Sequence, residues 1–184
     1  MEIILMRHGK PACATSLKVT SREMPQWVAQ YHLSETGNDM PPASARLLAS
    51  GALQVISSPL PRTLSSLRTL GREPDLIDDV FREADLPLFP FPALRLSPLQ
   101  WATLFRLLWL CGISRNTESF GMAKKRAAQA ASILIKRARE TNGPVLLMGH
   151  GVMNRLIAKE LMSQGWEVHS RPGQGYWNAA VYRL

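Results

Sequence analysis

The chain has 184 residues, of which 46% are apolar and 20% are charged. These proportions are ordinary for a globular protein and exclude a disordered or fibrous chain. Its 22 lysines and arginines outnumber its 14 aspartates and glutamates, so the formal net charge is +8. Such an excess favours an anionic partner, which could be a phosphorylated compound, a nucleic acid or an acidic membrane surface.

The cysteines and the apolar segments of the sequence bear on the cellular location of the protein. Cys13 and Cys111 lie far apart and show no CxxC or metal-binding spacing, so we expect no disulfide framework and a cytoplasmic location. The N-terminus lacks a basic leader followed by a long apolar run, and we expect no signal peptide. The most apolar stretch, 99–113, is shorter than the roughly 20 residues that span a bilayer, and Arg106 interrupts it. No membrane span is predicted.

Apolar periodicity predicts strands and helices that alternate along most of the chain. In chain order we expect a strand over 2–6, helices over 24–32 and 41–50, a strand over 53–57, a helix over 60–70, a strand over 74–81, helices over 98–112 and 119–141, a strand over 145–149, a helix over 152–165 and a strand over 178–184. Ser58 is expected to cap the helix after the second strand, with Pro59 in its first turn. The Pro-rich segment 85–94 is expected to be irregular.

The alternation favours an α/β fold: a three-layer sandwich in which helices cover both faces of a largely parallel central sheet. No linker or internal repeat divides the chain, so we expect one domain over residues 1–184. Its variable part is the segment around 84–118, where the apolar run at 99–113 is expected to pack as a cap over the active site.

Basic and imidazole side chains follow three of the predicted strands. Arg7 and His8 come after the first strand, Arg62 begins the helix after the second, and His150 follows the strand at 145–149. In a parallel sheet the carboxyl ends of the strands line the ligand crevice, so these side chains should converge. Helix N-termini favour anions and arginine binds phosphate oxygens in pairs, while the glycines beside the histidines permit a close approach of a ligand. The pattern predicts a phosphoryl pocket that contains imidazoles.

Three segments, RHG at 7–9, SSPLPR at 57–62 and GHGVMNR at 149–155, resemble the signature segments of the histidine phosphatase superfamily, whose fold is phosphoglycerate mutase-like. LSETG at 33–37 and TES at 117–119 resemble weaker landmarks of the same family. Their order and spacing agree, and the resemblance extends from residue 2 to the final strand.

The resemblance implies a two-step reaction through a phosphohistidine. His8 would be the nucleophile, and Arg7, Arg62 and His150 would hold the phosphoryl oxygens. A carboxylic acid would protonate the leaving oxygen and then activate water; we expect Glu83 in this role, with Asp85 as the alternative. Glu118 fits the role of a helix N-terminal carboxylate better, and His32 and His169 are expected to be ordinary surface residues.

The expected function is therefore hydrolysis of a phosphomonoester or another phosphorylated compound, with no metal ion or other cofactor. The substrate would be a phosphorylated small molecule or a phosphoprotein. A phosphoglycerate mutase is an alternative, but no asparagine follows RHG, where Ala14, Thr15 and Ser16 stand. A second alternative is a non-catalytic protein that binds a phosphorylated ligand or a nucleic acid. The intact set of basic and imidazole residues argues against such a loss of catalysis.

Overall fold

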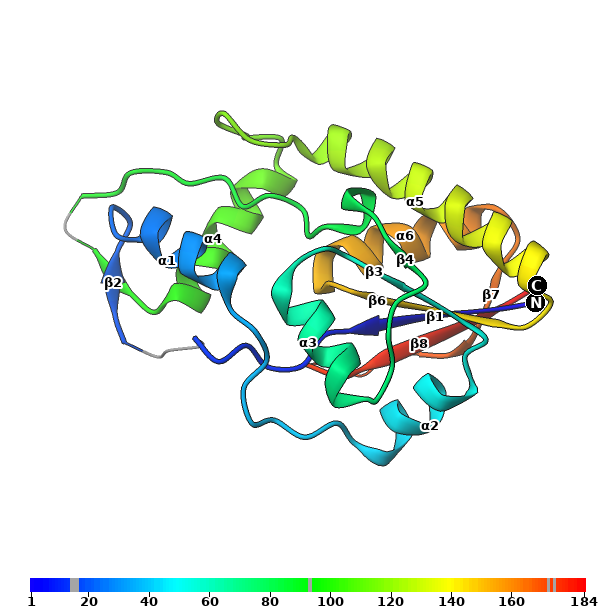
Figure 1. Cartoon of the computed structure of the whole chain (residues 1–184). Helices are drawn as coiled ribbons and strands as arrows, with labels where there is room; N and C mark the ends of the chain where they lie inside the picture. The colour runs from blue at the N-terminus through cyan, green and yellow to red at the C-terminus, as the bar shows by residue number, and fades with distance from the viewer. Residues whose placement is uncertain (14–16, 93, 172, 174) are drawn as a thin grey trace.

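A mixed, mostly parallel sheet lies at the centre of the computed structural model, which describes residues 1–13, 17–92, 94–171, 173 and 175–184 (Figure 1). Within these residues the sheet has six strands in the order β4-β3-β6-β1-β8-β7. Their bounds are β1 Glu2–Arg7, β3 Gln54–Ser57, β4 Leu76–Ile77, β6 Pro144–Gly149, β7 Glu167–Ser170 and β8 Ala179–Arg183. The first four strands of that order run parallel to one another, whereas β8 is antiparallel to β1 and β7 is antiparallel to β8.

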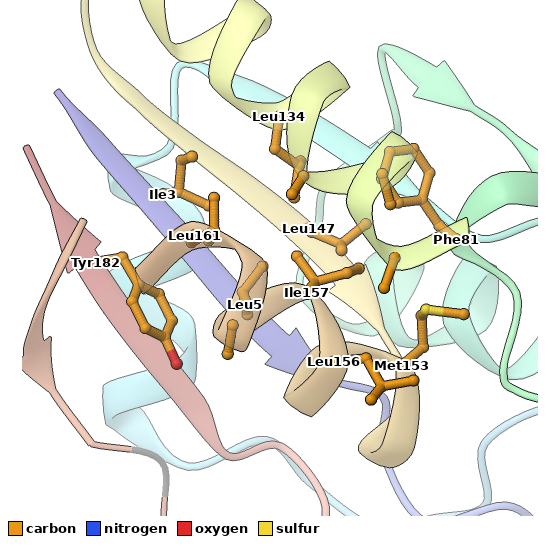
Figure 2. Packing of buried hydrophobic residues seen from close by; sticks show 14 of the residues in the cluster. Ile3, Leu5, Phe81, Leu134, Leu147, Met153, Leu156, Ile157, Leu161 and Tyr182 are labelled. Atoms are coloured by element: carbon orange, nitrogen blue, oxygen red, sulfur yellow. The ribbon is translucent and has the colours of Figure 1, made fainter. Parts of the chain in front are cut away.

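The four inner residues of β1, Ile3–Met6, are apolar, and both faces of the strand are buried there. Ile3 and Leu5 pack in one cluster with α5 (Phe120–Thr141) and α6 (Gly151–Ser163), as Figure 2 shows. Ile4 and Met6 point to the opposite face, into a cluster with α2 (Ala43–Gly51) and α3 (Pro61–Thr69). Alternate residues of a strand face opposite sides, so a continuous apolar run is what a doubly covered strand requires. The predicted α/β sandwich is confirmed.

A separate group of elements, which we call the cap, lies to one side of the sheet (Figure 1). It consists of β2 (Val19–Thr20), α1 (Met24–Leu33), β5 (Arg95–Leu96) and α4 (Pro98–Leu110). Met24, Trp101 and Phe105 form its own small buried cluster. The Trp101 indole N–H donates to the carbonyl of Val19 at 2.9 Å and so fastens α4 to β2. No helix in the described part of the chain is both long and apolar enough to cross a membrane.

Two local predictions were wrong. The strand expected over 74–81 shortens to β4, because the Asp78 carboxylate accepts the N–H of Val80 and starts the 3-10 helix η1 (Asp79–Phe81). The helix after β3 begins at Pro61 rather than at Pro59, and Ser58 does not cap it. The hydroxyl of Ser58 is instead shared between the N–H of Leu60 and the ring of His150.

The sequence pattern also missed three short strands. β7 is exposed along its whole length, so it carries no apolar alternation. β2 and β5 have two residues each and pair only with each other, which leaves too few positions for a periodic signal. The other expected helices and strands are present, with ends that differ by a few residues. The extent of a single domain over residues 1–184 stays a prediction.

Candidate active site

The sheet register brings the ends of β1, β3 and β6 to one edge. Arg7 lies opposite Gly149, and Ser57 lies opposite Met148. The chain then continues directly into His8 after β1 and into His150 after β6. Their ring centroids are 5.1 Å apart, in an edge-to-face arrangement. Residues separated by more than 140 positions in the sequence thus form one cluster.

Both nitrogens of the His8 ring have a hydrogen-bond partner. Its Nδ1 lies 2.7 Å from the carbonyl oxygen of Gly9, and because a carbonyl only accepts, we assign the ring proton to Nδ1. The lone pair is then on Nε2, where the Arg62 Nε–H lies 3.3 Å away. Burial, assisted by the charge of Arg62, lowers the pKa of His8 to about 3. The imidazole is therefore neutral and nucleophilic at ordinary pH.

The His150 ring is arranged as a donor. Its Nε2 lies 2.9 Å from the Ser58 hydroxyl, which accepts the N–H of Leu60 and can therefore give its own proton to that nitrogen. A hydroxyl has two acceptor lone pairs, so the contact fits either tautomer; with Ser58 as the donor, the ring proton lies on Nδ1. Nδ1 is buried and has no hydrogen-bond partner within the described ranges. Burial first, and the charge of Arg62 second, hold the pKa of His150 well below its usual value, so the ring is a neutral N–H donor.

Two arginines complete the cluster, and each lies under a tyrosine ring. Arg62 donates to the carbonyl of Tyr31 at 3.2 Å, and its guanidinium lies 4.7 Å from the centre of the same residue's ring. The Arg7 guanidinium lies 4.3 Å from the ring of Tyr176, and its Nε, buried, finds no partner among the residues described. Such cation–π contacts fix the planes of the guanidinium groups. Two fixed arginines and the Nδ1–H of His150 are donors that suit a tetrahedral anion.

Glycines at this edge allow protein groups to pack closely, rather than making room for a ligand as we expected. A side chain at position 9 would overlap the indole ring of Trp177, and one at position 149 would overlap the amide of Asn154. The N–H of Gly9 also donates to the hydroxyl of Ser66 at 2.9 Å. The loop that carries His8 is therefore clamped between α3 and the segment before β8.

A sequence profile of the histidine phosphatase superfamily (branch 1) matches residues 3–184. The chain belongs to this superfamily. The match includes all three strand ends that carry His8, Arg62 and His150. No curated protein sequence matches the chain at a significant level.

Solved structures with the same fold are distant in sequence. A mycobacterial glucosyl-3-phosphoglycerate phosphatase is 16% identical with a TM-score of 0.62, over 98% of this chain and 91% of that one. A phosphoserine phosphatase from Entamoeba histolytica is 15% identical with a TM-score of 0.60, over 98% and 89%. A putative alpha-ribazole-5'-P phosphatase from Escherichia coli is 19% identical with a TM-score of 0.55, over 100% and 95%. At these identities the likeness shows the fold.

Glu83 lies at the same helix end as His150. Its carboxylate accepts the N–H of Met153 at 2.9 Å and that of Val152 at 3.2 Å, in the first turn of α6. Because His150 is the residue that precedes this helix, the carboxylate and the imidazole share one helix N-terminus. Glu83 and the alternative residue, Asp85, both line a hollow of about 250 Å³ together with Glu118 and Arg126.

Glu118 has a structural role that differs in detail from a simple helix-end carboxylate. Its two oxygens accept from Arg126 at 2.8 and 2.7 Å, and both side chains are largely buried. Arg126 also donates to the carbonyls of Val80 and Arg82. Arg126 therefore fastens α5 to the segment that carries Glu83.

Sequence reasoning missed four residues of this region. Tyr31 and Tyr176 cover the arginines, Ser66 holds the His8 loop, and His32 lies close enough for Arg62, after burial, to lower its pKa. Only Tyr176 had a signal, since it follows the Gly-rich turn after His169. Tyr31 and His32 belong to a helix without any motif.

Two expectations cannot be placed on the structure. Ala14, Thr15 and Ser16, which stand where the mutase branch carries an asparagine, lie outside the described residues. Across the described ranges, no group of three histidine, cysteine or acidic side chains is arranged to hold a metal ion.

Proposed function

We propose that this member of the superfamily is a phosphatase that hydrolyses a phosphomonoester, or another phosphorylated compound, through a phosphohistidine on His8. The Nε2 lone pair of His8, which accepts from Arg62 alone among the described residues, and the unpartnered Nδ1 of His150 carry this proposal. A buried neutral imidazole surrounded by fixed positive charge is suited to accept a phosphoryl group.

In the first step, the Nε2 lone pair attacks phosphorus and the bond from phosphorus to the ester oxygen breaks. The leaving oxygen takes that electron pair and a proton from the Glu83 carboxyl group. Arg7, Arg62 and the Nδ1–H of His150 balance the charge that spreads over the three equatorial oxygens. Because the arginines supply this charge, we propose that the reaction needs no metal ion.

In the second step, water attacks the phosphohistidine and the bond from phosphorus to Nε2 breaks. The electron pair returns to Nε2, the Glu83 carboxylate takes a proton from the water, and inorganic phosphate leaves. The Glu83 carboxylate accepts from three backbone N–H groups, those of Ala84, Val152 and Met153, so acting as the acid requires it to exchange one of these bonds for the leaving oxygen.

Access to Nε2 requires movement, because His8 is only 2% exposed and Arg62 only 1%. The rings of Tyr31 and Tyr176 lie over the two arginines, and they are the side chains a phosphoryl group must displace. The Arg62 Nε–H would then donate its hydrogen bond to a phosphoryl oxygen instead of to His8. This change of acceptor frees the Nε2 lone pair of His8 when the substrate binds.

Phosphate release from a panel of phosphorylated metabolites and phosphopeptides tests this function. Wild-type protein should release phosphate, and His8→Ala should lower kcat/KM by about 10⁴-fold. His169→Ala is the matched control, since His169 is exposed on β7, and it should retain wild-type activity. Equal activity of wild type and His8→Ala would contradict the proposal.

The same assay separates the alternatives. A mutase would convert one phosphoglycerate into its isomer without net phosphate release. A non-catalytic binding protein would do neither, and its affinity for a nucleic acid would fall steeply with salt while being unaffected by His8→Ala. We propose the cytoplasm as the setting, since Cys13 and Cys111 are both free thiols.

A further inference from the structure

The helix α4 is apolar on two opposite sides, but only one side is covered. Trp101, Phe105 and Trp109 are fully buried against the rest of the protein. On the other side, the exposed fractions are 76% for Leu99, 56% for Leu107, 51% for Leu110 and, just after the helix, 48% for Ile113. A helix that is apolar all round is normally covered all round. We call these four residues the outer face of the cap.

Basic side chains, without acidic ones, accompany this outer face. The segment 86–117 contains no aspartate or glutamate, and its three charged residues are Arg95, Arg106 and Arg115. Arg95 and Arg115 are exposed and flank the two ends of α4. Lys18 is exposed beside Arg95, whose guanidinium donates to the Lys18 carbonyl at 3.0 Å. Glu23 is the acidic residue of the adjoining turn, and Thr20 holds its carboxylate with two hydrogen bonds.

We propose that the outer face of the cap docks on the surface of an anionic lipid bilayer. Leucine and isoleucine side chains would enter the boundary between headgroups and acyl chains, and the flanking cations would meet lipid phosphates. The basic rim selects this occupant, since a second copy of a chain with a net charge of +8 would bring like charges together. α4 has 13 residues, so it lies on a bilayer rather than across it.

Docking at this place would also orient the reaction centre. α1 packs in the cap cluster through Met24, and at its other end Tyr31 contacts Arg62. The helix that carries the outer face and the arginine of the proposed reaction therefore contact the same short helix, α1. The docking proposal stands on α4 and its charges alone, and it holds whether or not the chain is a phosphatase.

Co-sedimentation with vesicles tests the proposal on the whole chain. Vesicles of phosphatidylcholine mixed with phosphatidylglycerol should bind the protein, vesicles of phosphatidylcholine alone should bind it at least about tenfold more weakly, and added salt should weaken the binding. The double variant Leu107→Glu/Leu110→Glu should lose at least about tenfold in binding to the anionic vesicles. Leu47→Glu, which alters an equally exposed leucine on α2, is its control and should bind like wild type.

Charge variants give a second, independent readout. Arg95→Gln and Arg115→Gln should each weaken binding about fivefold, whereas Lys136→Gln on α5 should leave it unchanged. All these positions are exposed, so circular dichroism and p-nitrophenyl phosphate turnover should match wild type. Equal binding to neutral and anionic vesicles, or full binding by the leucine double variant, would overturn the proposal. So would a wild-type dimer in analytical ultracentrifugation that this double variant converts to a monomer.

Discussion

The reaction centre and the cap are built in different ways. In the centre, His8 and His150 come from strand ends that the sheet register aligns, and their rings are oriented by bonds to Gly9 and Ser58. In the cap, α4 is held by aromatic contacts to the segment before it, such as that between Phe91 and Trp101, whose ring centroids are 5.6 Å apart, and β2 and β5 form a pair of two-residue strands beside it. The comparison shows that the His8 and His150 rings are positioned by the sheet, while the cap has a buried cluster of its own.

The largest expected effect concerns the stability of the cap. Phe105 is fully buried in the cap cluster, so Phe105→Ala should lower the free energy of unfolding of the cap by about 3–5 kcal/mol. Because this cluster is separate from the main core, amide hydrogen exchange should accelerate in α1 and α4 and leave β1 and β6 protected. Phe81→Ala, at an equally buried phenylalanine of the main core, is the control and should accelerate exchange in the sheet as well. Identical exchange patterns in the two variants would erase the distinction between the regions.

Next in size is the loss of a charge in the reaction centre. Arg62→Met removes the guanidinium but keeps most of its volume, and kcat/KM should fall about 10³-fold because transition-state charge loses a donor. The free energy of unfolding should be unchanged or higher, since a buried charge is costly. Arg46→Met, at an exposed arginine of α2, should change neither quantity. Wild-type turnover by Arg62→Met would place the phosphoryl site elsewhere.

The position of the acid comes next. Glu83→Gln should slow hydrolysis of alkyl phosphates about 10²-fold, because their leaving oxygen needs a proton. The rate of hydrolysis of p-nitrophenyl phosphate should change far less, because its leaving group departs as a stable phenolate and needs no proton. Asp85→Asn is the matched variant on the same segment and should affect both substrates little. If Asp85→Asn slowed the hydrolysis of alkyl phosphates selectively and Glu83→Gln had little effect, Asp85 would be the acid.

The strand ends were predictable from the sequence because they combine a continuous apolar run with an abrupt change to basic and imidazole residues. That change identified Arg7, His8 and His150 together with their common edge. The role of Glu83 is not derivable in this way, since a carboxylate in a loop has no pattern and its position depends on how the chain returns to α6.

The cap was only partly predictable from the sequence, because contacts between segments far apart in the chain leave no local pattern. The helical spacing of Trp101, Phe105 and Trp109 predicted α4, and their burial confirms that this side of the helix packs. The contacts of Tyr31 with Arg62 connect two elements that lie far apart in the sequence, and no local signal encodes such a pair. Ser58 was misread because its tertiary partner, His150, competes with the local capping role.

The smallest expected effect is a pH dependence of stability that comes from His8 in the centre. His8 has a usual pKa of 6.5 and a folded pKa of about 3, so below pH 6.5 the unfolded chain binds a proton that the folded chain excludes. Its contribution to stability is therefore complete above pH 6.5 and declines as the pH falls towards 3. Between pH 7 and pH 5 this decline should amount to about 2 kcal/mol.

Denaturant unfolding at these two pH values measures the effect. His8→Gln should lose about 2 kcal/mol less than wild type between pH 7 and pH 5. His169→Gln, at an exposed histidine, should lose as much as wild type. Equal losses in all three proteins would mean that His8 is not held neutral by the fold.

Trapping the covalent intermediate tests the central claim most directly. Protein incubated with a radiolabelled phosphate ester, quenched in base and digested should carry label on the peptide that contains His8. The linkage should survive base and break in acid, as a bond between phosphorus and an imidazole nitrogen does, and His8→Ala should carry no label. Label that resists acid, that maps to another residue or that persists in His8→Ala would contradict the proposed mechanism.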